Sequence, residues 1–291
     1  MLEHLNPNTV KPRRVVIIGA GGFVGGAIRK KLASEGVNTL ALTRKDLDLL
    51  ADGAAEKLQG LLQPTDSVVM VSAVAPAKTI SDLIQNLKMA EVVCKALSAA
   101  TIAHLVYISS DAVYVDDANP VNERSCCAPS TLHGMMHAAR ELMLKSSTRA
   151  PFAALRPSLI YGAADPHNGY GPNRFRSQAA KGEPITLFGE GEEKRDHVFI
   201  HDVCRLMTRC LMRQSRGTLN IATGRSISFG EIAVKIQTLF QGKVAIEPSP
   251  RVNPITHRHY DVTQLLEAFP DFRFTLLDQG LEQTFRAIQK S

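Results

Sequence analysis

The chain has 291 residues, and 44% of them are hydrophobic, which suffices for the core of one large domain or two smaller ones. Its net charge of +6 favours anionic ligands such as nucleotides, yet no block of like charges marks a nucleic-acid-binding arm. Five cysteines without a zinc-binding spacing, and no apolar leader or membrane-length apolar run, predict a cytoplasmic protein with no metal and no membrane partner.

The first half of the chain alternates apolar strands with helices. Val15–Ile18 is a short β-branched run, and a glycine-rich turn and a helix that ends near Gly36 follow it. Further strands are expected at 39–43, 67–73 and 103–110, with a long helix at 80–100 and another that starts at Ser130. This alternation predicts an α/β fold, a Rossmann-type doubly wound parallel sheet.

The regular alternation of strands and helices ends after Tyr161. Residues 161–175 are rich in Gly, Pro and Asn and read as a loop. Short mixed elements follow, with helices at 201–213 and 228–240 and the stretch "GTLNIAT" between them. We expect a dinucleotide-binding domain over 12–165. Residues 166–291 are expected to form mainly a smaller α/β substrate-binding region, with a part near 197–225 that returns to the first domain.

The glycine turn has the spacing of a dinucleotide fingerprint. Gly19, Gly22 and Gly25 lie between a strand and a helix, where glycines allow a tight turn, close approach of a pyrophosphate to the helix N-terminus, and close helix–strand packing. A tight turn without a ligand is the alternative interpretation.

The end of the second strand bears on the cofactor. NAD binding usually uses an acidic residue there, but this strand ends at Thr43, Arg44 and Lys45. The two cations favour NADP, whose 2′-phosphate they could bind, over NAD, although NAD stays possible. The alternative is that Arg44 and Lys45 only point into water.

Several stretches together resemble the extended short-chain dehydrogenase/reductase family of nucleotide-sugar epimerases, dehydratases and reductases: "GAGGFVG", "VYISSDAVY", "LRPSLIYG" and "GEGEEKRDHVFIHDV". The resemblance implies the following site residues: Gly19, Gly22, Phe23, Val24 and Gly25 for the pyrophosphate, Asp48 and Leu49 for adenine, Ala73 and Ala75 along the cofactor, Ser110 in the active site, and Asn173, Arg195 and Arg258 for the substrate phosphates. Each arginine could instead be a surface salt-bridge residue.

The catalytic pair departs from the family pattern. Counted from Pro129, the family's Tyr and Lys positions hold His133 and His137, so Y-x-x-x-K has become H-x-x-x-H, and Leu159 stands where the family often has Asn. Imidazole can carry a proton near neutral pH but supplies no fixed charge when neutral. Three interpretations stay open: a catalytic pair, a polar lining left after catalysis was lost, or a shared metal ion, for which a third ligand is missing.

The resemblance implies an NAD(P)-dependent oxidoreductase or epimerase that acts on a nucleotide-linked sugar. A hydride would pass between sugar and nicotinamide while His133 moves the proton and Ser110 binds the reacting oxygen. The alternative is a catalytically silent protein that binds NADP(H) or a sugar nucleotide. A homodimer is a possible assembly for either.

Overall fold

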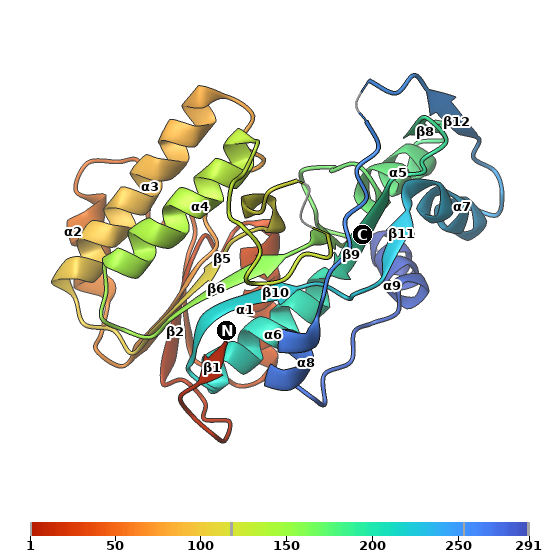
Figure 1. Ribbon diagram of the computed structural model, residues 1–291. Coiled ribbons are helices and arrows are strands. Elements are labelled where there is room, and N and C mark those ends of the chain that lie inside the picture. The colour runs from red at the N-terminus through yellow and green to blue at the C-terminus, as the bar shows by residue number, and fades with distance from the viewer. Residues whose placement is uncertain (1, 117–118, 253, 290–291) are drawn as a thin grey trace.

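A mostly parallel sheet organises the first lobe of the molecule (Figure 1). The computed structural model describes residues 2–116, 119–252 and 254–289. In this part of the chain the central sheet has seven strands, ordered β1-β10-β6-β5-β4-β2-β3. They are β1 (Glu3–His4), β2 (Arg14–Ile18), β3 (Thr39–Leu42), β4 (Asp66–Met70), β5 (His104–Ile108), β6 (Phe152–Pro157) and β10 (Ser215–Ile221). Only β1 is antiparallel to its neighbour, so the predicted fold class is confirmed.

Helices cover both faces of this sheet, which is why its strands are apolar on both sides. One face packs against α1 (Phe23–Ser34) and α6 (Ile200–Met212). The other face packs against α2 (Ala54–Leu61), α3 (Ile80–Ala99) and α4 (Leu132–Ser146). The carboxyl ends of β2, β4 and β5 therefore open at one edge between two helical layers.

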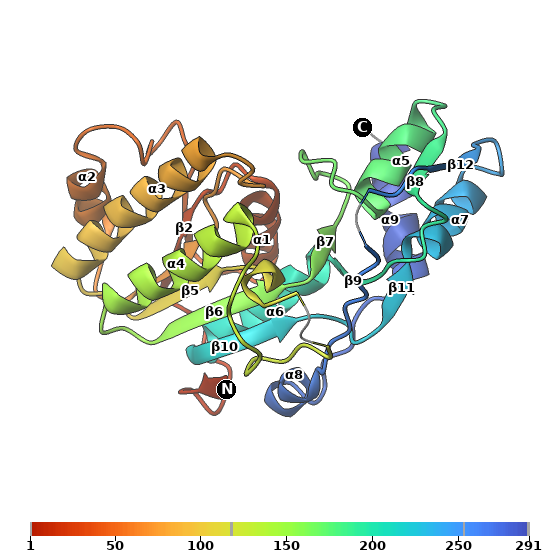
Figure 2. The same ribbon diagram turned by 45° about the horizontal axis from the view of Figure 1, so that its top comes forward.

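A second lobe lies beside this edge, joined to it through β7 and β9 (Figure 2). It contains a sheet ordered β11-β9-β7 and a second sheet of β12 and β8. Its elements are β7 (Leu159–Tyr161), β8 (Ile185–Phe188), β9 (Lys194–Phe199), β11 (Ser226–Ser228), β12 (Ile246–Ser249), α5 (Pro172–Ala180), α7 (Phe229–Leu239) and α9 (Leu277–Gln289). The chain passes back along the first lobe through α8 (Thr263–Ala268) before α9.

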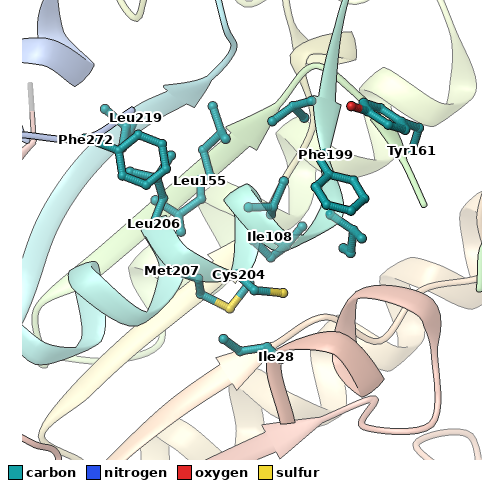
Figure 3. Close-up of a cluster of buried hydrophobic side chains, with 14 of the residues drawn as sticks. Ile28, Ile108, Leu155, Tyr161, Phe199, Cys204, Leu206, Met207, Leu219 and Phe272 are labelled. Atoms are coloured by element: carbon teal, nitrogen blue, oxygen red, sulfur yellow. The ribbon is translucent and has the colours of Figure 1, made fainter. Parts of the chain in front are cut away.

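One hydrophobic core runs through both lobes (Figure 3). Cys204 and Met207 of α6 pack beside Ile28 of α1, and the same cluster includes Leu155 of β6 and Leu219 of β10. Thus α6 and β10, which follow the second-lobe strand β9 in sequence, complete the first-lobe sheet and its helical layer. The position of the second lobe over the sheet edge is therefore fixed by buried packing.

Most predicted elements lie within three residues of their observed bounds. The main correction is the loop predicted at 161–175, because α5 already begins at Pro172. Proline at the first helical position is pre-organised for a helix start, and Gly171 before it has φ 113°. Among the described residues, no helix is both long and apolar enough to cross a membrane.

Candidate active site

The glycine turn between β2 and α1 is built for a close ligand. Gly19 has φ 98°, and a Cβ there would lie 2.7 Å from the Cα of Ser72, so only glycine fits. A Cβ on Gly25 would overlap the carbonyl oxygen of Gly19. Gly22 caps α1 without a side chain, so the first-turn amides, including those of Phe23 and Val24, lack intrahelical acceptors and stay available as donors. These features fit the pyrophosphate of a dinucleotide.

The tip of β3 carries the predicted selector for the cofactor. The Arg44 side chain is 82% exposed, and its Nε donates to Asp48 Oδ2 over 3.2 Å. Asp48 also accepts from the amide of Leu50 through Oδ1, while Leu49 is buried. Arg44 is therefore an exposed surface cation, held by one ion pair that solvent and salt screen.

The segment after β4 lies opposite the glycine turn. It carries Ala73 and Ala75, and the buried amide of Asn86 on α3 holds it in place. Asn86 Oδ1 accepts from the Val74 amide over 3.0 Å, and its Nδ2 donates to the Val74 carbonyl over 2.8 Å. These two hydrogen bonds fix the segment after β4, where the family resemblance implies that Ala73 and Ala75 line the cofactor.

The two histidines stand at the start of α4. Thr131 caps the helix, and its Oγ1 accepts from the Gly134 amide. A Cβ on Gly134 would overlap the carbonyl oxygen of Ala112, so glycine lets α4 press against η1 (Asp111–Val113), which directly follows Ser110. The rings of His133 and His137 meet edge to face with centroids 4.7 Å apart. The predicted catalytic residues therefore come from adjoining elements.

His133 faces polar groups from three segments. Its Nδ1 accepts from the Ala77 amide over 3.4 Å. Burial lowers the pKa of His133, and the positive charge of His167 acts in the same direction, while Asp111 opposes them. His133 is therefore mostly neutral at pH 7 and able to accept a proton.

His137 is buried against β5. Its Nδ1 lies 2.7 Å from the hydroxyl of Tyr107. Burial, assisted by the charges of His133 and Arg140, lowers the pKa of His137 well below its usual value. Burial also raises the pKa of Tyr107 to about 12. Both side chains are thus uncharged at neutral pH.

Ser110 is joined to a carboxylate that was not predicted from sequence. Ser110 Oγ accepts from the Ala112 amide over 3.1 Å and donates to Asp111 Oδ1 over 3.3 Å. Asp111 also accepts a short hydrogen bond from the hydroxyl of Tyr260, which comes from the far end of the chain. The available signal was the acidic residue directly after Ser110. Nothing local pointed to Tyr260.

The two predicted phosphate-binding arginines sit where the C-terminal segment crosses between the lobes. Arg258 is buried, and its guanidinium donates to the carbonyls of Asp111 (3.1 Å) and Val115 (3.2 Å). Arg195 donates to Thr256 and pairs with Glu193 Oε1 at 2.5 Å. The Arg258 amide in turn donates to the carbonyl of Lys194, so the two residues lie on neighbouring segments.

Asn173 is engaged within its own lobe. Its Oδ1 accepts from the Gly162 amide over 3.1 Å, and its Nδ2 donates to the Ile160 carbonyl and to Asp165. Leu159, at the position of the family Asn, is 37% exposed and pairs in register with His197 of β9. Asn173 thus shapes the loop that leads into α5 in this conformation.

Metal binding finds no support in the described part of the chain, where no three His, Cys, Asp or Glu side chains converge on a point that could hold an ion. His133 and His137 instead contact each other, Ala77 and Tyr107.

Comparisons with known proteins identify the fold and the family of this chain. The chain is similar to a GDP-L-fucose synthetase from Naegleria fowleri bound to NADP, with 16% identity and a TM-score of 0.87 over 100% of this chain and 98% of that one. It is also similar to the UDP-glucose 4-epimerase of Thermotoga maritima with UDP-glucose, with 20% identity and a TM-score of 0.83 over 95% of this chain and 99% of that one. The UDP-glucose 4-epimerase of Thermus thermophilus with NAD gives 21% identity and a TM-score of 0.81 over 96% of this chain and 99% of that one. At these identities the likeness concerns the fold. The profile of the NAD dependent epimerase/dehydratase family matches residues 15–222, from β2 to the end of β10, and the chain therefore belongs to that family.

Proposed function

We propose that this protein is an NAD(P)-dependent enzyme that oxidises or reduces a carbon of a nucleotide-linked sugar, as a reductase, dehydratase or epimerase. One observation carries the proposal. Ser110 and His133 come from adjoining elements at the carboxyl edge of the parallel sheet, the same edge that carries a glycine turn fit for a pyrophosphate. Open α/β sheets bind their ligands at this edge.

The protein's own residues divide the work as follows. The glycine turn and the amides of α1 bind the pyrophosphate and thereby place the nicotinamide over the end of the sheet. When bound, the nicotinamide supplies the hydride donor or acceptor. Ser110 holds the reacting sugar oxygen through its hydroxyl. His133 takes the proton of that oxygen during oxidation, or returns it during reduction.

The proposed cofactor is NADP(H). Arg44 is the exposed cation at the tip of β3, and no acidic residue holds that position. Its bond to Asp48 would be exchanged for the 2′-phosphate. Because the pair is exposed, the exchange gives up little free energy.

The proposed substrate is held between the lobes by Arg195 and Arg258. A guanidinium matches the paired oxygens of a diphosphate. Arg195 would exchange Thr256 and Glu193 for phosphate, whereas Arg258 already sits beside the Ser110 segment. Asn173 would act from the loop that leads into α5.

The test combines binding and turnover. Titration calorimetry with NADP(H) and NAD(H), followed by a panel of UDP-, GDP- and dTDP-sugars, is expected to give binding of both partners and cofactor-dependent conversion of at least one sugar. Binding without conversion of any member would favour the silent binding protein. Absence of dinucleotide binding would refute the proposal outright.

A matched pair of variants tests the substrate site. Arg195→Ala is expected to weaken sugar-nucleotide binding by about 1.5–3 kcal/mol, the contribution of a hydrogen bond to a charged group. Arg216→Ala removes an exposed arginine near the start of β10, where it pairs with Glu3, and serves as the control. Unchanged sugar-nucleotide affinity in Arg195→Ala would place this residue outside the pocket.

A further inference from the structure

Arg140 is a fully buried cation on the same stripe of α4 as His133 and His137. It follows His137 by one helical turn, so the two side chains project from one face of the helix. Its Nη2 donates to the Ser72 carbonyl over 2.6 Å, and its Nη1 donates to Asn86 Oδ1 over 3.4 Å. Its guanidinium carbon lies 5.3 Å from the centre of the Tyr107 ring.

This guanidinium has no carboxylate partner among the described residues, and its Nε has no hydrogen-bond partner there. The other buried arginines are paired: Arg156 with Glu141, and Arg258 with Asp111 and Asp116. Buried charges in proteins are normally paired, because an isolated one is strongly destabilising. A neutral side chain of similar length would fill the same space at lower cost. The charge of Arg140 therefore calls for an explanation.

The protons of Tyr107 and His137 can be assigned from their contacts. The Tyr107 hydroxyl is buried, and its one hydrogen-bond partner in the described chain is Nδ1 of His137, at 2.7 Å. Since the described residues offer the hydroxyl proton no other acceptor, we assign it to the bond with Nδ1. That nitrogen must then be unprotonated. His137 is consequently neutral, with its proton on Nε2.

We propose that Arg140 is a positioning residue that supplies the fixed positive charge of this site and, together with burial of the ring, keeps His137 neutral in the Nε2–H form. Within the proposed function, Arg140 then supplies the fixed charge that a neutral His137 lacks at the position of the family's lysine. Arg140 provides the charge from its buried position on α4, and His137 provides a hydrogen-bond donor, its Nε2–H. The proton that moves during the reaction is confined to His133.

The other groups around the pair agree with this assignment. On α4 itself, a charge on His133 would repel a charge on His137 and so also lowers the pKa of His137. Glu141 on the same helix is paired with Arg156 and accepts a hydrogen bond from Ser109. On β5 the neighbour is the neutral phenol of Tyr107, and on α3 it is the neutral amide of Asn86. Asp111 and His167 act on His133 with opposite signs. Arg140 is thus the permanent cation next to His137.

The experiment measures the histidines directly in the free protein. Two-bond ¹⁵N–¹H correlation spectra report the tautomer and protonation of each imidazole as pH changes. In the wild type, His137 is expected to be the neutral Nε2–H tautomer at pH 6. A wild-type His137 that is charged at pH 6, or carries its proton on Nδ1, would overturn the proposal without any variant.

Three variants separate charge from packing. In Arg140→Met, which fills similar space, the pH of half-protonation of His137 is expected to rise but to stay below the ordinary value of about 6.5, because burial still acts on the ring. Arg140→Lys keeps the charge but cannot reproduce the guanidinium bonds, and should keep His137 neutral. Lys145→Met removes an exposed cation from the same helix and should change nothing. If His137 titrates as in wild type in a folded Arg140→Met protein, the charge of Arg140 does not act on His137, and Arg140 has only a structural role.

These readouts are independent of turnover. If no nucleotide sugar is converted, the proposed function fails while the spectra still decide the role of Arg140. If turnover is found, Arg140→Met should shift its pH–rate profile, and Arg140→Lys should restore the wild-type profile. An equal loss of rate in both variants with an unshifted profile would contradict the charge role even where the function holds.

Discussion

His133 differs from a tyrosine at the same position in a property that can be measured. An imidazole changes charge near neutral pH, whereas a phenol does so near pH 10. Because burial lowers the pKa of His133, the ring is already neutral at pH 7. The pH dependence of any reaction at this site should therefore carry the signature of a histidine.

Replacement of His133 by Phe is expected to lower turnover by about 10²–10⁴-fold, the usual contribution of a general acid–base group. In wild type, the rate of alcohol oxidation should fall as pH drops through the pKa of His133, which burial lowers below the ordinary value of about 6.5, because protonation removes the base. The reverse reduction should slow as pH rises through the same range. Steady-state rates in both directions measure this. His201→Phe, on the exposed face of α6, is the control, and a wild-type rate in His133→Phe would remove His133 from the mechanism.

At the scale of elements, the glycine turn offers two neighbouring glycines with opposite surroundings. A Cβ on Gly25 would overlap the Gly19 carbonyl, whereas a Cβ on Gly26 would lie 3.8 Å from the Ala20 oxygen, an ordinary contact. Gly25→Ala should force α1 away from the turn and weaken dinucleotide binding at least about tenfold, or about 1.4 kcal/mol.

Gly26→Ala is the matched control. It adds the same methyl group inside the same helix, and should leave dinucleotide affinity intact while raising the free energy of unfolding by about 0.5–1 kcal/mol. Titration calorimetry and urea unfolding of both variants measure these effects. Equal dinucleotide affinity in the two variants would mean that the packing of α1 on the turn does not shape the binding site.

The tip of β3 carries the prediction on cofactor choice. Because Arg44 is an exposed cation in the place of an acidic selector, NADP(H) should bind more tightly than NAD(H). Arg44→Ala should weaken NADP(H) binding by about 1.5–3 kcal/mol and leave NAD(H) almost unchanged. Parallel titrations of wild type and variant test this. Equal wild-type affinities for the two cofactors would contradict the selector role.

At the scale of the whole molecule, buried histidines tie stability to pH. Burial lowers the pKa of His104, in the sheet of the first lobe, to about 4 and that of His197, in the second lobe, to about 3. The unfolded chain, with an ordinary value of about 6.5, takes up these protons first. The resulting stability is complete above a pH of about 6.5 and is lost as pH falls from there toward the folded values.

From a pH of about 7.5 to about 5.0, each of these two histidines should therefore lower the free energy of unfolding by about 2 kcal/mol. His197→Phe, which removes two ring nitrogens that have no partner in the described chain, should reduce this drop by about that amount. His257→Gln, at an exposed position, should not. Urea unfolding at both pH values decides it, and an unchanged pH dependence in His197→Phe would contradict the argument.

The sequence alone determined what depends on neighbours along the chain. Strands such as Val15–Ile18, the glycine spacing of the turn and the helical register of His133 and His137 are set by local periodicity and backbone freedom. These patterns predicted the parallel fold, which the structure confirms, and placed both histidines one turn apart on one helix. They could not show which partners the side chains would meet.

The tertiary structure alone decided those partners. Arg258 reaches the carbonyl of Asp111, 147 residues earlier, and Tyr260 bonds to the carboxylate of the same residue from 149 residues away. Arg140 meets Ser72, 68 residues earlier on another element, and so becomes a buried cation beside His137. Long-range packing brings these groups together, and no local pattern encodes it, because a side chain's charge state depends on neighbours supplied by distant segments.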